Sequence, residues 1–213
     1  MMSKAPDLKP RKVDTKEKRV EKIQYDLDKI QEDFDKNIAD TESKFEIADS
    51  LKAGKMASAE DIWRTQVVFL DSALDFYVHE ITKFGITKIL YDEWEETKEF
   101  ANFRISMRFV KKLVQSPENI NLFLGELERV TQRNCFMHYE QLTKQLELLG
   151  VKVNLLSYEQ NINKLYKRRN EIAHQADITN GKKNHINEDD VKSFISVVKS
   201  VQNEIHQVIK KKG

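Results

Sequence analysis

The chain has little of the material that makes cross-links and tight turns. Its 213 residues include one cysteine, six glycines and three prolines. The single cysteine, Cys135, excludes an internal disulfide and fits a reducing cytoplasm, and the shortage of glycine and proline leaves few tight hairpins. No apolar run reaches the roughly 18 residues of a membrane-spanning helix, and no signal-peptide core is present. We therefore expect a cytoplasmic protein without a membrane span.

The chain also lacks an excess of positive or negative charge. The 36 Lys and Arg residues nearly balance the 35 Asp and Glu residues, and the formal net charge is +1. So small a charge gives no overall attraction to nucleic acid, and any such contact must depend on local basic patches. The chain also lacks a Walker loop, a dinucleotide-binding glycine pattern and a zinc motif, and its five histidines are scattered. We predict no metal site and no cofactor.

What the sequence does contain is helical periodicity. Apolar residues recur every three or four positions, and no segment keeps the period of two that a half-buried strand requires. We predict an all-α helical bundle with three parts: a flexible basic arm at 1–12, a long amphipathic helix at 13–55, and a helical domain at 56–213. The apolar face of the long helix packs either on its own domain or on a partner chain, and the sequence leaves both open.

Capping residues, prolines and glycines divide the helical domain into segments. The predicted helices cover 58–84, 104–115, about 117–130, a segment ending at Gly150, 157–176 and 188–212. We expect a short helix or irregular turns at 86–103 and a polar loop at 177–187. A capping box is predicted at Ser157, and Asn187 is predicted to cap the last helix.

The most informative segment is 164–174, inside the predicted 157–176 helix. The apolar positions around it repeat with the helical period and place Arg169 at the centre of the apolar face. A buried guanidinium without a partner is costly, so Arg169 requires a buried acid, a polar cleft or an interface. Glu80 is the first candidate for that acid, because it falls on the apolar stripe of the 58–84 helix.

His174 follows Arg169 five residues later, and the pair suggests phosphoryl chemistry. Arginine offers a planar fork that matches phosphate oxygens, and histidine can move a proton near neutral pH. RNA brings its own nucleophile, the 2′-hydroxyl, so these two side chains suffice without a metal. On an ideal helix, however, the two residues lie about 140° apart. A shared cleft requires Arg169 to reach round the helix, a distorted helix end, or a second subunit.

Two segments match Arg-x4-His, at 169–174 and at 133–138, and a resemblance separates them. Arg-Asn-Glu-Ile-Ala-His at 169–174 resembles the signature of HEPN domains, and most closely the RiboL-PSP-HEPN subgroup, in which Arg-Asn-x-Ile-Ala-His is typical. The segment 71–81 is similar to the first core helix of that subgroup. The resemblance covers roughly 58–205 and leaves out the N-terminal 55 residues. Because the 133–138 match lacks the Ile-Ala pair, we interpret it as incidental.

The resemblance implies a dimeric helical bundle that cuts RNA without a metal. The implied catalytic residues are Arg169, His174 and Asn170. The candidate supporting acids are Glu80 and Glu171, and the candidate RNA-binding cations are Lys164, Lys167 and Arg168. The implied product carries a 2′,3′-cyclic phosphate, and the implied setting is toxin-like growth arrest or antiviral defence.

Two other hypotheses stay open at this stage. In one, the chain is a non-catalytic HEPN-like adaptor that binds protein or RNA through its long N-terminal helix and basic arm. In the other, the chemistry lies at Arg133 and His138. Cleavage of RNA that depends on His174 would distinguish the nuclease with its site at Arg169 and His174 from both of these hypotheses.

Overall fold

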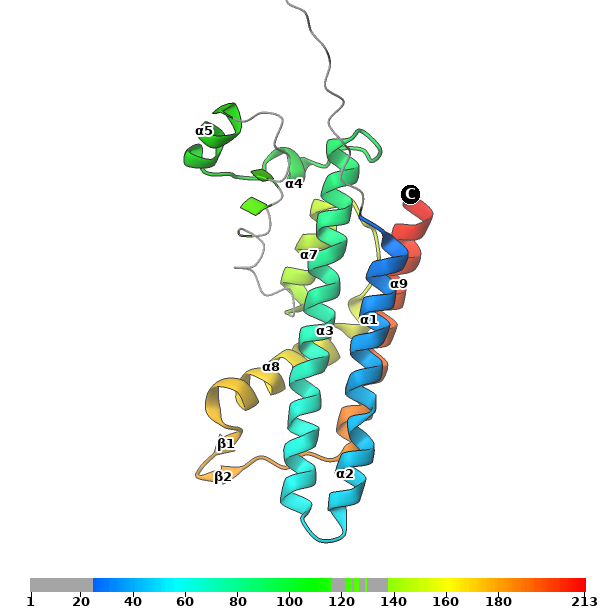
Figure 1. Ribbon diagram of the computed structural model, residues 1–213, viewed down its shortest axis with the longest axis vertical. Coiled ribbons are helices and arrows are strands. Elements are labelled where there is room, and N and C mark those ends of the chain that lie inside the picture. The colour runs from blue at the N-terminus through cyan, green and yellow to red at the C-terminus, as the bar shows by residue number, and fades with distance from the viewer. Residues whose placement is uncertain (1–24, 116–121, 124, 127–128, 130–137) are drawn as a thin grey trace, which may run out of the picture.

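One long helix organises the molecule. The computed structural model describes residues 25–115, 122, 123, 125, 126, 129 and 138–213, and it confirms the all-α bundle. The central helix is α3 (Met56–Leu90), and the helices that pack against it are α1 (Leu27–Glu42), α2 (Lys44–Lys52), α7 (Tyr139–Leu148), α8 (Glu159–Gln175) and α9 (Glu188–Lys212). In Figure 1, α1 and α9 run along one side of α3, and α8 leads away on the other. The basic arm at 1–12 lies outside the described residues, as does most of the predicted helix at 117–130.

The predicted amphipathic segment is described from residue 25, and it forms two consecutive helices. These are α1 and α2 (Lys44–Lys52), which meet at Ser43. The apolar residues Ile30, Phe34 and Ile38 of α1 are buried, and both helices pack on α3. Of the two alternatives that the sequence left open, the described part of the segment therefore shows packing on its own domain.

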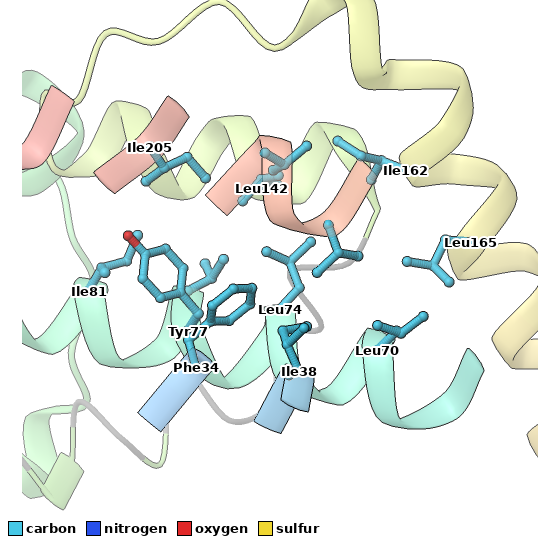
Figure 2. Close-up of a cluster of buried hydrophobic side chains, with 14 of the residues drawn as sticks. Phe34, Ile38, Leu70, Leu74, Tyr77, Ile81, Leu142, Ile162, Leu165 and Ile205 are labelled. Atoms are coloured by element: carbon cyan, nitrogen blue, oxygen red, sulfur yellow. The ribbon is translucent and has the colours of Figure 1, made fainter. Parts of the chain in front are cut away.

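The hydrophobic core lies where α3 meets its neighbours (Figure 2). Its central side chains come from five helices: Phe34 and Ile38 of α1, Leu70, Leu74, Tyr77 and Ile81 of α3, Leu142 of α7, Ile162 and Leu165 of α8, and Ile205 of α9. Burial of each such side chain contributes about 1.5–3 kcal/mol. Because α8 inserts two of them, its next turn, which carries Arg169, is also held against α3.

The central helix is longer than predicted at both ends. It begins at Met56, with Lys55 rather than Ser58 before its first turn, and it continues through Gly85 to Leu90. Gly85 lies inside the helix and does not end it. Its missing side chain leaves room for two neighbouring side chains. A Cβ atom there would lie 2.9 Å from both Leu149 Cδ2 and Trp94 Cζ3. The glycine is therefore a packing residue and not a helix stop.

The remaining elements are short, and they test the predicted helix ends. They are α4 (Lys98–Ala101), α5 (Met107–Gln115) and the 3-10 helix η1 (Leu156–Tyr158). The capping box predicted at Ser157 is wrong, since this residue lies inside η1 and α8 begins without a side-chain cap. The cap at Asn187 is confirmed, and it forms a full capping box with Asp190. No helix in the described ranges combines the length and the apolar character needed to cross a membrane.

A small hairpin replaces the polar loop predicted at 177–187. Strand β1 (Ile178–Thr179) pairs antiparallel with β2 (Lys182–Lys183). Its turn residues, Asn180 and Gly181, have φ values of 51° and 77°. Asn-Gly is the dipeptide most typical of two-residue hairpin turns, because both residues tolerate positive φ. The hairpin follows α8 directly, so it lies at the end of the helix that carries His174 (Figure 1).

We predict that Gly85→Ala lowers the free energy of unfolding by about 1 kcal/mol. Alanine favours a helix interior over glycine by about 1 kcal/mol, but overpacking a filled core costs about 1–3 kcal/mol. The buried Leu149 and Trp94 side chains would have to move to admit the methyl group. Urea unfolding measures the change. Gly54→Ala is the control, since nothing lies within 4 Å of a Cβ atom at that position; a Gly85→Ala protein as stable as wild type would contradict the packing role.

Candidate active site

Three residues with complementary chemistry lie together near the C-terminal end of α8. Arg169 Nη1 donates a hydrogen bond to Asn170 Oδ1 at 2.9 Å and lies 3.5 Å from His174 Nε2. Asn170 and His174 are separated by one turn and share a face of the helix. The structure therefore places a guanidinium, a carboxamide and an imidazole within reach of one small group.

Arg169 meets His174 by reaching round the helix within one protomer. Its backbone lies on the buried face of α8, but its long side chain carries the terminal nitrogens to the exposed side. The helix remains regular through Gln175, so no distortion is needed. Of the three routes that the sequence allowed, the first is therefore the one observed. No second subunit is required to bring these two groups together.

His174 is exposed in the last turn of α8. A guanidinium can only donate hydrogen bonds, so His174 Nε2 is the acceptor in a hydrogen bond from Arg169 Nη1, and the tautomer that accepts there carries its proton on Nδ1. An exposed imidazole in this state can accept a proton from a substrate hydroxyl.

The acid beside Arg169 is Asp71, and the predicted pairing with Glu80 is wrong. Arg169 Nε lies 3.1 Å from Asp71 Oδ2, and Asp71 is buried. Glu80 pairs instead with Lys83 at 2.8 Å. The two acids lie about 180° apart around an ideal helix, so Glu80 points away from the side of α3 that meets Arg169. Burial, and to a smaller extent the nearby Asp75, raise the pKa of Asp71 against the attraction of Arg169, to about 7.

A sequence signal for Asp71 exists, although the search for apolar stripes passed over it. Val67, Asp71, Leu74 and Val78 are spaced four, three and four residues apart, and all four are buried. A charged residue in an otherwise apolar row needs a buried partner. The row therefore marks Asp71 as a candidate partner for a cation on another element.

Arg168, a predicted RNA-binding residue, pairs with an acid of its own chain in the structure. Both of its terminal nitrogens pair with the carboxylate of Asp177, and Nη2 lies 2.9 Å from Oδ2. Arg64 of α3 donates to the same carboxylate from Nε at 2.5 Å. Asp177 and Arg64 are both buried. The buried acid draws Arg168 inward, so its guanidinium is engaged inside the protein.

These ion pairs fix the chain just beyond His174. Ala176 and Asp177 have φ values of 51° and 58°, in the left-handed region that non-glycine residues seldom adopt. Asn184 Nδ2 donates to Asp177 Oδ1 at 3.1 Å, and its backbone N donates to the Asp177 carbonyl at 2.8 Å. The carboxylate thus joins the hairpin, the end of α8 and α3. The turn that carries His174 is held from three sides.

The other predicted supporting residues lie on the outer side of α8. Lys164 Nζ lies 5.7 Å from the centre of the Phe194 ring, and Lys167 Nζ lies 3.9 Å from Glu171 Oε1. Both lysines are exposed. Glu171 also lies 3.4 Å from Arg168 Nη1. Within the described chain, the ion pairs of Glu171 are therefore with cations other than Arg169.

The second Arg-x4-His match is described only at His138, since Arg133 lies outside the described residues. His138 precedes α7, and its ring packs edge-on against Tyr166 of α8 with the ring centres 5.7 Å apart. In the described ranges, no three His, Cys, Asp or Glu side chains are grouped closely enough to hold a metal ion.

A family model described as RiboL-PSP-HEPN matches residues 3–211. The chain belongs to the RiboL-PSP-HEPN family. HEPN domains are generally metal-independent ribonucleases, and they often act on RNA as dimers. The family model covers more of the chain than the resemblance over 58–205, and it includes the N-terminal segment that the resemblance left out. The charged amphipathic helix of that segment carries no motif by which the sequence alone reveals its membership. Searches of curated proteins and of solved structures found no match.

We expect Asp177→Asn to destabilise this HEPN domain by about 3 kcal/mol at pH 7. Loss of the carboxylate removes the buried partner that Arg64 and Arg168 share, and each keeps only more exposed acids, Glu60 and Asp61 for Arg64 and Glu171 for Arg168. Burial alone would raise the pKa of Asp177, but hydrogen bonds from Arg64, Asn184 and Arg168 outweigh it and lower the pKa. The stabilisation is therefore present above the unfolded-state pKa of about 3.9 and is lost as the pH falls through the lower folded-state pKa.

Denaturant unfolding of wild type and variant at pH 7 and pH 3 measures this effect. The difference between the two proteins should shrink at pH 3. Asp189→Asn, which changes an exposed acid in the first turn of α9, is the control and should have a small effect at both pH values. A difference that is the same at pH 7 and pH 3 would show that the charge of Asp177 is not what stabilises the helix end.

Proposed function

We propose that this protein is a metal-independent endoribonuclease whose active site contains Arg169, Asn170 and His174. The observation that carries this function is the 3.5 Å approach of Arg169 Nη1 to the exposed His174 Nε2. A phosphate bound by the arginine at this position lies beside an imidazole that can take a proton. Membership in the RiboL-PSP-HEPN family supports the same chemistry.

The reaction takes its nucleophile from the RNA. The 2′-hydroxyl oxygen attacks the adjacent phosphorus, and the bond between phosphorus and the 5′-oxygen breaks. His174 Nε2 accepts the proton of the 2′-hydroxyl, and the leaving 5′-oxygen takes a proton from water. The products are a 2′,3′-cyclic phosphate and a 5′-hydroxyl. A positioned general base of this kind contributes about 10²–10⁴-fold to the rate.

Arg169 binds the phosphate and stabilises the negative charge that develops on its oxygens. Its Nη2 carries two N–H groups that no residue of the described chain engages, so they are available to phosphate oxygens. Asn170 accepts a hydrogen bond from Nη1 and so orients the guanidinium before substrate arrives. Donors that are already in place need little reorganisation during the reaction.

We infer that RNA approaches along the exposed side of α8, where Lys164 and Lys167 contribute positive charge. Contacts of this kind to phosphates weaken as salt rises, because binding releases counterions. Two protomers would pair with their α8 helices facing each other across a two-fold axis. Toxin-like growth arrest or antiviral defence is the proposed setting.

No specific observation favours the adaptor hypothesis. The apolar residues of α1 that a partner would bind, Ile30, Phe34 and Ile38, are already buried in the core. In the described part of the N-terminal segment, Ile47 is the exposed large apolar side chain, and one such residue does not form the apolar face that this role needs.

We predict that purified wild-type protein cuts a mixed RNA pool in EDTA and that His174→Ala reduces cutting by about 10²–10⁴-fold, the usual contribution of a general base. Gel analysis with time courses measures the rates. His138→Ala is the matched control, because it removes the histidine of the other Arg-x4-His segment and should leave cutting unchanged. Circular dichroism confirms that each variant is folded.

The pattern across these three proteins decides the question. Cutting by wild type and His138→Ala, but not by His174→Ala, assigns the chemistry to α8. Equal cutting by all three indicates a contaminating nuclease. Wild-type protein that cuts no RNA in the pool contradicts the proposed activity on general RNA.

Arg169→Lys is expected to lower kcat by about 10²–10³-fold, although it keeps the positive charge. Lysine is a point charge without the planar fork, and loss of one preorganised donor has an effect of this size in comparable sites. Steady-state kinetics on a mapped RNA site measures it. A rate within a factor of three of wild type would show that the shape of the guanidinium is not used.

A further inference from the structure

Asp71 is buried with incomplete hydrogen bonding. Its Oδ2 lies 3.1 Å from Arg169 Nε, but the two atoms do not have the alignment of a hydrogen bond. Its Oδ1 is buried, and no residue in the described part of the chain forms a hydrogen bond to it. A buried polar atom without a partner destabilises a fold by about 1–3 kcal/mol. Asp71 is therefore a poor choice for stability alone.

The pKa of Asp71 supports this reading. Burial raises it, Arg169 of α8 lowers it and Asp75 of α3 raises it, and the result of the three effects is a pKa of about 7. An acid with a raised pKa opposes folding when it is ionised, so it lowers stability as the pH rises from about 4 to about 7. An apolar residue in this row, like its neighbours Val67 and Leu74, would avoid that cost.

What Asp71 does provide is a fixed orientation for Arg169. The carboxylate faces Nε on the buried side, while Nη1 lies between Asn170 and His174 on the open side. Among the described residues, none forms a hydrogen bond or an ion pair with Nη2. The guanidinium thus faces Asp71 at one edge, while Nη1 contacts Asn170 and His174 and both N–H groups of Nη2 are left for a phosphate.

We propose that Asp71 is a positioning residue for RNA cleavage, which holds Arg169 through Nε so that Nη1 stays beside Asn170 and His174 and Nη2 is presented to the phosphate. This role rests on the proposed nuclease function. In this role Asp71 of α3 positions the Arg169 guanidinium of α8, although Asp71 is not part of the Arg-x4-His motif.

The test compares Asp71→Asn with Glu80→Gln. Glu80 lies on the same helix, is partly buried and pairs with Lys83, so it matches the chemistry of the change without contacting Arg169. Asp71→Asn should lower kcat by about 10–100-fold with a much smaller change in KM, whereas Glu80→Gln should cut as wild type does. At pH 8 the unfolding midpoint of Asp71→Asn should be at or above that of wild type, because the variant has no buried charge to form.

Two results would overturn the positioning role. One is cutting by Asp71→Asn at the wild-type rate. The other is a lower unfolding midpoint at pH 8 together with a loss of activity no larger than the loss of folded protein, which is the signature of a purely structural residue.

Failure of the nuclease proposal is recognised separately. If wild type cuts no RNA, the Arg169 Nε–Hε signal in nitrogen-15 NMR still reports on Asp71. The signal should be protected from exchange in wild type and in Glu80→Gln, and it should exchange faster in Asp71→Asn. The same exchange rate in all three proteins would mean that Asp71 does not hold the guanidinium.

Discussion

The pairing of Arg169 with a buried acid is the constraint on which the rest of the site depends. The arginine lies on the apolar face of α8, where neighbouring side chains enter the core, and its Nε is buried. Asp71 of α3 lies 3.1 Å from that nitrogen. With Nε directed inward, the terminal nitrogens lie beside Asn170 and His174 at the surface. The geometry of an exposed site is thus set by a charge in the interior.

A second set of buried charges fixes the other half of the site. Asp177, held by Arg64 and Arg168, ends α8 in two left-handed residues and ties the hairpin to α3. Backbone conformations of this kind cost about 1–3 kcal/mol each and persist only where the surroundings enforce them. The positions of both candidate site residues therefore depend on α3. Arg169 is held through an aspartate on that helix, and His174 is held through an arginine on it. A single long helix gives the two supports a common frame.

The sequence predicted the local features well and the long-range pairs poorly. Helical periodicity gave the all-α fold, and the motif on α8 located Arg169 and His174. The pairing of Asp71 with Arg169 joins residues far apart in the sequence, and periodicity cannot choose between acids on one helix. Glu80 was the predicted partner of Arg169 because it lies on an apolar stripe of α3. Since α3 has neighbours on several sides, a position on such a stripe does not reveal which helix the residue faces. The dipeptide Asn180-Gly181 was a sequence signal for the hairpin. The polar composition of residues 177–187 led to the prediction of a loop instead.

The central claim is that Arg169 and His174 act on a phosphate attacked by the RNA's own 2′-hydroxyl. The most direct test uses two RNAs with the same mapped cleavage site, one of which carries a single 2′-deoxy nucleotide immediately 5′ of the scissile phosphate. Both are incubated with wild-type protein in EDTA. The account predicts cutting of the all-ribose RNA, with a 2′,3′-cyclic phosphate at the new end, and no cutting at the deoxy position. Equal cutting of the two RNAs would contradict it, because the nucleophile would then have to come from water or from the protein.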